Sequence, residues 1–323
     1  MEDLFYQKRD VNNYDNIVVD IQSLFESYPV NFKENPSPGF NSFTQSIFHK
    51  FYRNRFIPLN YRRYLYRGFR QINLDLTWFD EFKSYWTNVL GARSFWGVHD
   101  LYFLKNLYRI KAQYLQVPDT DNPEIHLNAW QRPEMIFQLL HLVAKESVSD
   151  KVYLIKNFQR LTKFKKNLNI LEFGCATAPI TASIFEFLKI HNNSKLYISD
   201  IQTLPFHYAI YRFRKCLNVI PLLLSPDNNF ELNLNSKLDV IFCTAVFEHL
   251  NNPIETIKSF NKLLKKEGIL FFDYIKCDGD GLDTVHSVRQ RDDVLDFIFD
   301  KFDIISGTIS KDISGGDVIA IKK

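Results

Sequence analysis

Residues 167–178 read Asn-Leu-Asn-Ile-Leu-Glu-Phe-Gly-Cys-Ala-Thr-Ala, and this stretch decides the fold. The apolar run Ile170–Phe173 breaks at Gly174 into a loop of small residues. Pro179 then opens an apolar-periodic segment that reaches Ile190. A buried strand, a tight turn and a helix in this order begin a nucleotide-binding βαβ unit. The sequence therefore predicts a ligand-binding edge at the carboxyl end of this strand.

A second buried strand follows at Lys195–Ser199 and ends on Asp200. A carboxylate at the tip of the second strand can accept hydrogen bonds from both hydroxyls of a ribose. The spacing therefore indicates a ligand that carries a nucleoside.

Further apolar runs predict five more strands, at Val219–Leu224, Leu238–Thr244, Ile269–Tyr274, Ile304–Ile309 and Val318–Ile321. Strands that alternate with helices form a parallel sheet covered on both faces, whereas the last two adjacent strands predict an antiparallel edge pair. The run at Val219–Leu224 contains a proline, which cannot donate to a ladder, so we expect this strand at an edge. The fold class is therefore α/β, with a doubly wound, mostly parallel, seven-stranded sheet.

The turn residues predict where the later elements begin and end. Asn252 and Pro253 are an N-cap and a first helical residue, and we expect this helix to run to Lys266 and end before Gly268. Residues 287–302 are amphipathic and predict another helix. Gly315-Gly316 predicts the turn between the two closing strands.

Together these residues resemble the S-adenosylmethionine (SAM) site of class I methyltransferases. That family's first motif is an acidic residue, any residue and then Gly-x-Gly-x-Gly. Here it reads Glu172, Phe173 and Gly174, with Ala176 and Ala178 at the other two glycine positions. The phrases Phe-Glu-His-Leu-Asn-Asn-Pro (247–253) and Leu-Leu-Lys-Lys-Glu-Gly-Ile-Leu (263–270) are similar to the small-molecule branch, the type 11 and 12 domains. The resemblance covers about residues 165–323.

The resemblance implies SAM as the cofactor and S-adenosylhomocysteine (SAH) as the product. It places Glu172 beside the amino group of the methionine part and Asp200 at the ribose. Ile201 would pack on the adenine, and Asp227, in a loop where it could equally be a turn residue, would accept from the adenine amino group. The remaining implied cofactor contacts come from the loops after strands one and four, at Gly174, Cys175, Ala176, Thr244 and Ala245.

Methyl transfer is an in-line displacement with a neutral leaving group, so it needs placement and, for a hydroxyl acceptor, a base. Histidine is the natural base near neutral pH. His286, at the end of the loop 276–286, is our first candidate, and His249, which follows strand four, is the second. A capping or packing role is the alternative for both. We expect no metal site.

Residues 1–164 predict a mainly helical domain that completes the acceptor pocket as a lid, and residues 165–323 the SAM-binding domain. The predicted helices of the first half are 77–90, 100–117, 132–148 and 152–164, with a polar break at 118–123. The alternative is a docking or oligomerisation module. The stretch 49–70 combines arginines with aromatic residues, which suits an anionic partner, or else arginines that snorkel over an aromatic core.

The predicted function is methylation, with oxygen favoured, of a small molecule or glycan that can be anionic. An RNA or other anionic-polymer methyltransferase is the alternative, because the first half is basic. A degenerate binding module is the second alternative. Adenine methyltransferases carry an Asp/Asn-Pro-Pro-aromatic box after the fourth strand. Here residues 244–247 read Thr-Ala-Val-Phe, so the box is absent. Gly174-x-Ala176-x-x-Pro179 also argues against a dinucleotide oxidoreductase.

The bulk composition bounds the remaining possibilities. No apolar run approaches the roughly 18 residues of a membrane span. The four cysteines are widely spaced and contain no Cys-x-x-Cys, which is typical of buried residues in a reducing compartment rather than of a disulfide framework. The N-terminal residues also lack the layout of a signal peptide, so we expect a cytoplasmic location.

Overall fold

The computed structural model describes residues 77–90, 101, 105, 116–131, 135–146, 152–163, 165–188, 194–279, 281–313 and 315–323. The expectation for the basic aromatic stretch 49–70, and most of the helix expected at 100–117, lie outside these residues.

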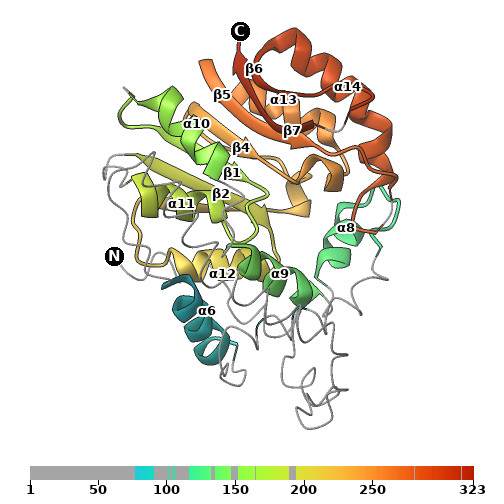
Figure 1. The fold of residues 1–323 in the computed structure, drawn as a ribbon. Coiled ribbons are helices and arrows are strands. Elements are labelled where there is room, and N and C mark those ends of the chain that lie inside the picture. Colours follow the sequence, from blue (N-terminus) through green and yellow to red (C-terminus); the bar gives the residue numbers. More distant parts are fainter. Residues whose placement is uncertain are drawn as a thin grey trace, which may run out of the picture.

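A seven-stranded sheet of order β3-β2-β1-β4-β5-β7-β6 organises the second half (Figure 1). Its strands are β1 (Asn169–Phe173), β2 (Lys195–Ile201), β3 (Val219–Leu224), β4 (Leu238–Cys243), β5 (Leu264–Tyr274), β6 (Phe302–Thr308) and β7 (Gly315–Lys322). All neighbours pair in parallel except β7, which runs antiparallel to both β5 and β6. The predicted fold class is confirmed, and the proline-bearing β3 lies at an edge.

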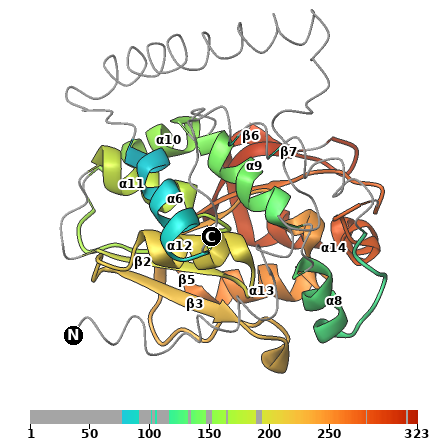
Figure 2. The same ribbon diagram turned by 90° about the horizontal axis from the view of Figure 1, so that it is seen from below.

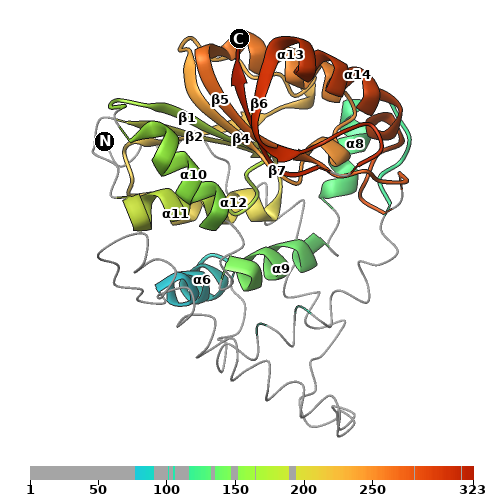
Figure 3. The same cartoon turned by 45° about the horizontal axis from the view of Figure 1, so that its top comes forward.

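Helices cover both faces of the sheet (Figure 3). One face packs against α10 (Val152–Thr162), α11 (Pro179–Leu188) and α12 (Leu204–Arg212), and the other against α13 (Pro253–Leu263) and α14 (Val285–Lys301). Successive strand residues alternate between these two cores, because side chains on a strand point to opposite faces. Ile170 thus belongs to the first core and Leu171 to the second.

The described helices of the first half are α6 (Thr77–Asn88), α8 (Pro123–Trp130) and α9 (Ile136–Glu146). Helices α6 and α9 pack on the outer side of α12 (Figure 2). The Tyr85 hydroxyl lies 2.8 Å from His207 Nδ1, and Ser84 Oγ lies 3.0 Å from the Tyr211 hydroxyl. Helix α8 lies apart from them, near α14 (Figure 2). The two contacts of α6 with α12 fix this part of the first half to the sheet domain.

The end of α13 differs from the prediction. The helix stops at Leu263, and β5 begins at once with Leu264, which pairs with Leu238. The register then jumps to Ile269, so the residues between form an irregularity inside β5. A Cβ at Gly268 would lie 2.9 Å from the Leu264 side chain and from the Lys265 carbonyl oxygen. Gly268 therefore permits a tight bulge and does not end the helix.

Two other boundaries also differ. Gly315 and Gly316 begin strand β7 instead of forming the turn. Helix α14 begins at Val285, where the Thr284 side chain caps it by accepting from Ser287 N–H. His286 therefore lies in the first turn of a helix and not in a loop, because the capping threonine precedes it.

Helix α8 was not predicted. The sequence Asn122-Pro123-Glu124 carries the same cap-and-proline signal that predicted α13, but it was included in the polar break. In the structure Asn122 Oδ1 accepts from the backbone N–H groups of Glu124 and Ile125. The helix matters because it carries residues of the cavity described below.

We expect Phe271→Ala to destabilise the fold by about 3–5 kcal/mol, because it removes a fully buried ring and leaves a cavity. The Phe271 ring stacks on Phe242 at a centroid distance of 4.6 Å. Chemical denaturation measures the change. Phe299→Ala is the matched control, since this ring is 39% exposed and should cost far less. Equal losses for the two variants would contradict the assignment of the core.

Candidate active site

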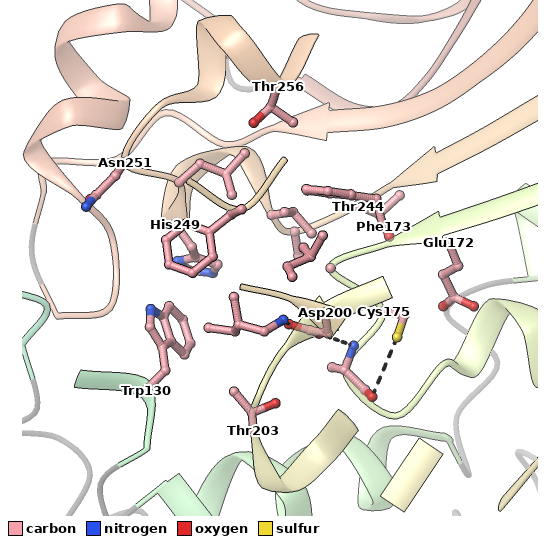
Figure 4. A pocket seen from close by; sticks show the side chains of 18 of the residues that line it. Trp130, Glu172, Phe173, Cys175, Asp200, Thr203, Thr244, His249, Asn251 and Thr256 are labelled. Carbon is pink, nitrogen blue, oxygen red and sulfur yellow. Dashed lines mark hydrogen bonds between the residues drawn. The ribbon is translucent and has the colours of Figure 1, made fainter. Parts of the chain in front are cut away.

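A cavity of about 370 Å³ opens at the carboxyl edge of the strands (Figure 4). Its walls come from the segments that follow β1, β2, β3, β4 and β5 and from helices α8, α9 and α13. A volume of this size lies in the range of small-molecule sites, and its place obeys the rule for open α/β sheets.

The loop after β1 has an unusual backbone. Gly174 has a φ of +62°, and a Cβ there would lie 2.5 Å from the Val246 side chain. Ala176 and Ala178 also have positive φ values, of 47° and 52°. Left-handed backbone costs a residue with a Cβ about 1–2 kcal/mol. The chain therefore keeps the glycine-type conformation at both positions where alanine replaces glycine.

Glu172 lies at the end of β1 and is 4% exposed. Its two carboxylate oxygens accept from the backbone N–H groups of Ile180 (3.1 Å) and Thr181 (2.7 Å). These groups belong to the first turn of α11, where a negative charge is stabilised by the helix dipole. Glu172 lines the cavity and also fixes the helix that follows the loop.

Asp200 holds the same loop from the neighbouring strand. Its carboxylate accepts from the N–H of Ala176 at 2.6 Å and from that of Ile201 at 2.7 Å. Burial raises the pKa of this carboxyl to about 6, although both hydrogen bonds and His249 act to lower it. A carboxylate has room for about four hydrogen bonds, so Asp200 can still accept from a ligand.

The remaining predicted contacts divide into two groups. Cys175, Ile201, Thr244 and Ala245 line the cavity with Gly174 and Ala176. Burial raises the pKa of the Cys175 thiol, so it stays neutral. Asp227 is exposed, pairs with the Ser225 hydroxyl and is absent from the lining, whereas Phe230 from the same segment lines the cavity. The turn geometry of residues 225–229 directs Asp227 away from the cavity.

His249 lies at the cavity wall after β4. Its Nδ1 is 3.1 Å from both the Asp283 carboxylate and the Leu282 carbonyl oxygen. Its Nε2 is 3.9 Å from Glu248 Oε1. Burial opposes a charge on the ring, but the hydrogen bond to Asp283 and the nearby carboxylates outweigh it, so the pKa of His249 is raised. In the neutral ring, Nδ1 carries the proton that these oxygens accept, and Nε2 is a base.

His286 does not line the cavity. Its Nε2 is 2.8 Å from Asp119, and its Nδ1 is 3.5 Å from Asp121. Both carboxylates belong to the segment that precedes α8. The geometry thus gives His286 a docking contact, and it favours His249 of the two predicted bases.

A family model described as a methyltransferase domain matches residues 149–297. The match includes the Gly174 loop, Asp200 and His249, and it agrees with the strand order above. Residues 149–297 form a methyltransferase domain.

A curated relative of this domain is the uncharacterized methyltransferase C1347.09 of Schizosaccharomyces pombe. It is 28% identical over 134 residues, which are 40% of this chain and 45% of that protein. The chain therefore spans less than half the length of this relative.

Solved structures similar to the methyltransferase domain include a SAM-dependent methyltransferase from Aquifex aeolicus. It is 18% identical, with a TM-score of 0.41, over 54% of this chain and 90% of that chain. The N-methyltransferase NodS from Bradyrhizobium japonicum, in complex with SAH, is 14% identical, with a TM-score of 0.38, over 54% and 89%.

The walls of the methyltransferase domain suit a cationic cofactor. The lining carboxylates are Glu172, Asp200, Glu231 and Glu255, and the described lining residues include no lysine or arginine. SAM carries a sulfonium and an ammonium group, and carboxylates stabilise both. The positive-φ loop also lets the backbone approach a ligand closely. The residues present therefore fit SAM.

Sequence reasoning missed the residues of the cavity roof. These are His126 and Trp130 of α8 and Phe137 and His141 of α9. The helical pattern gave α9 but not which side chains face the sheet edge, since that depends on how the first half docks. Within the described ranges, no helix is both long and apolar enough to cross a membrane.

We expect Ala176→Gly and Ala178→Gly each to stabilise the fold by about 0.5–1 kcal/mol. The gain from relieving positive φ exceeds the entropy that glycine adds to the unfolded chain. Thermal denaturation measures it. Ala182→Gly, inside α11, is the control and should destabilise by about 1 kcal/mol. If Ala176→Gly and Ala178→Gly destabilised the fold as much as Ala182→Gly, the inference of backbone strain in this loop would be wrong.

Proposed function

We propose that the chain is a SAM-dependent methyltransferase that methylates a hydroxyl group of a small molecule or sugar. The observation that supports oxygen methylation is the His249–Asp283 pair at the cavity wall, with Nδ1 and Asp283 Oδ1 3.1 Å apart. An amine acceptor that is already neutral needs no base, whereas a hydroxyl gains from one. A histidine oriented by a carboxylate is built for that task.

For the cofactor, we assign the backbone of Gly174, Cys175 and Ala176 to the methionine part. Asp200 accepts from the ribose hydroxyls, and Ile201 and Phe230 pack on the adenine, while Asp227 has no part in this site. Glu172 keeps α11 and the loop in place and contributes negative charge near the amino group. Thr244 and Ala245 close the side of the site that follows β4. Each of the residues assigned to the cofactor lines the cavity, which supports the assignment.

For the reaction, SAM held by these residues would supply an electrophilic methyl group and a neutral leaving group. His249 Nε2 would accept the proton of the acceptor hydroxyl. Asp283 holds the imidazole in the tautomer that leaves Nε2 free to accept, and it stabilises the imidazolium that forms. The roof helices α8 and α9 line the part of the cavity that we assign to the acceptor.

The division into an acceptor-binding first half up to residue 164 and a SAM-binding second half remains part of this proposal. The lining of the cavity by α8 and α9 supports it. Methylation of RNA is the weaker candidate, because the described cavity wall offers no lysine or arginine for a phosphate. A cytoplasmic location also remains a proposal and rests on the free cysteines.

We expect the purified chain to bind SAH, and Asp200→Ala to weaken this binding by about 1.5–3 kcal/mol, the value of lost hydrogen bonds to a charged group. Isothermal titration calorimetry measures both. Asp227→Ala is the matched control and should bind like the wild type, since Asp227 is exposed outside the cavity lining. A wild-type protein that gives no heat and no thermal shift would support the degenerate-module alternative.

We expect His249→Ala to lower turnover on a hydroxyl acceptor by roughly 10²–10⁴-fold, with SAH affinity nearly unchanged. A base is active when deprotonated, so the wild-type rate should rise with pH through the raised pKa of His249. Asp283→Asn removes a charge that raises this pKa, so the midpoint should move to lower pH. Initial rates of SAH formation from pH 5.5 to 9 give the profile.

His286→Ala serves as the comparison for this experiment. It removes a docking contact but leaves Nε2 of His249 in place, so the midpoint of the pH profile should not move. A profile that follows His286 instead of His249 would reverse the assignment.

A further inference from the structure

Helix α8 places two polar aromatic side chains, one helical turn apart, in the cavity roof. His126 is 4% exposed and Trp130 is 6% exposed, and both line the cavity. His126 Nδ1 and Trp130 Nε1 have no hydrogen-bond partner. Figure 4 shows the nitrogen-bearing edge of the Trp130 indole turned toward His249.

Unpartnered buried polar atoms are costly, at about 1–3 kcal/mol each. They cannot be explained here by a loosely placed helix, because contacts at both ends fix α8. Gln131 Nε2 donates to the Gln202 carbonyl oxygen at 2.8 Å. Before the helix, Asn251 Nδ2 donates to the Thr120 carbonyl oxygen at 2.8 Å, and Val117 N–H donates to the Gly281 carbonyl oxygen at 2.9 Å. The two nitrogens therefore point to a ligand that supplies their partners.

The surroundings define the chemistry of that ligand. The Trp130 ring meets the candidate base His249 edge to face at 5.3 Å, and the His126 ring meets Phe230, which we assign to the adenine, at 5.9 Å. The Trp130 ring beside His249 therefore favours an acceptor with a ring of its own. Burial, followed by the charges of His249 and His286, lowers the pKa of His126 to about 4, so its imidazole is neutral near pH 7.

We propose that α8 is the acceptor-recognition element, and that His126 and Trp130 select an uncharged, ring-bearing acceptor with at least two oxygen functions. The inference rests on the proposed function, since it assigns the part of the same cavity that the cofactor leaves to the acceptor. One oxygen is the hydroxyl that gives its proton to His249. A second oxygen accepts from the Trp130 N–H, which can only donate. His126 Nδ1 pairs with this same second oxygen where it is a hydroxyl, which can either donate or accept as the tautomer requires. Both nitrogens are buried, so the two rings must turn to meet these oxygens.

Charge excludes the competing acceptor class. The carboxylates Glu231 and Glu255 line the same cavity, and the described lining residues include no lysine or arginine to balance an anionic ligand. An acceptor carboxylate or phosphate would therefore lose its hydration without gaining a lysine or arginine as its partner. A phenol and a sugar both satisfy the requirement for an uncharged ring with two oxygens, so the test must distinguish them.

The experiment uses the full chain with SAM and four probes in matched pairs. Catechol and methyl α-D-glucoside are the uncharged phenol and sugar, and 3,4-dihydroxybenzoate and glucuronate are their anionic counterparts. SAH formation gives the KM and kcat for each, and calorimetry gives the SAH affinity. We expect turnover with an uncharged probe to exceed that with its anionic counterpart by at least tenfold. The member that turns over identifies the phenol or the sugar class.

Trp130→Phe keeps the ring and removes the N–H. We expect it to raise the KM of the uncharged probe by about 3- to 10-fold, the effect of one lost hydrogen bond, while the SAH affinity stays the same. His126→Phe should act in the same way. Trp86→Phe is the matched control, because Trp86 is buried in α6 and does not line the cavity. It should change neither value.

Three results would overturn the inference. An equal loss of SAH affinity and acceptor KM in Trp130→Phe would assign α8 to the cofactor. Preference for the anionic probes would refute the charge argument, and SAH binding without turnover of either uncharged probe would refute the acceptor class. A wild-type chain that fails to bind SAH would instead refute the proposed function.

Discussion

Two carboxylates at the tips of adjacent strands hold the loop on which the site depends. Glu172, at the end of β1, accepts from the first turn of α11, and Asp200, at the end of β2, accepts from the Ala176 N–H at 2.6 Å. The loop between them runs through positive φ at Gly174, Ala176 and Ala178. Hydrogen bonds to charged groups contribute about 1.5–3 kcal/mol each, which is enough to offset the backbone strain of two alanines. The acidic residues thus shape the site before any ligand binds.

The same arrangement explains how the site reaches across the sheet. A Cβ at Gly174 would collide with Val246, which follows β4. The close approach of these two loops brings the His249 segment to the cavity that the β1 loop forms. Asp283, from the loop after β5, then orients His249. Three neighbouring strand ends therefore contribute to one chemical function, as expected at the carboxyl edge of a parallel sheet.

The roof of the cavity belongs to the first half of the chain. The segment before helix α8 is held by Gly281 in the loop after β5, by His286 in the first turn of α14 and by Asn251 in the segment before α13. His286, which was predicted to be a base, is part of this contact. Its helical position follows from the Thr284 cap. A histidine near a strand end can thus serve chemistry or docking, and the packing decides which.

Particular elements show how far prediction from the sequence could go. The apolar runs predicted the strands and their mostly parallel arrangement, because the burial of apolar faces follows a local pattern. The proline in β3 predicted that this strand lies at an edge of the sheet. The cap of α8 at Asn122 and Pro123 lies inside the polar stretch 118–123, whose composition predicts a break between helices. The end of α13 and the role of Gly268 could not be found, since the glycine permits a bulge whose tight contacts form only when β5 pairs with β4.

The sequence by itself determined the α/β fold, the strand-loop-helix at Gly174 and the two acidic strand tips, because each depends on residues that are close in the chain. Only the tertiary structure decided that Asp227 turns outward while Phe230 lines the cavity, and that His249 rather than His286 meets the cavity wall. It also decided that His126 and Trp130 lie opposite the sheet edge. The placements of His286, His126 and Trp130 depend on contacts between segments more than one hundred residues apart, which no local pattern specifies.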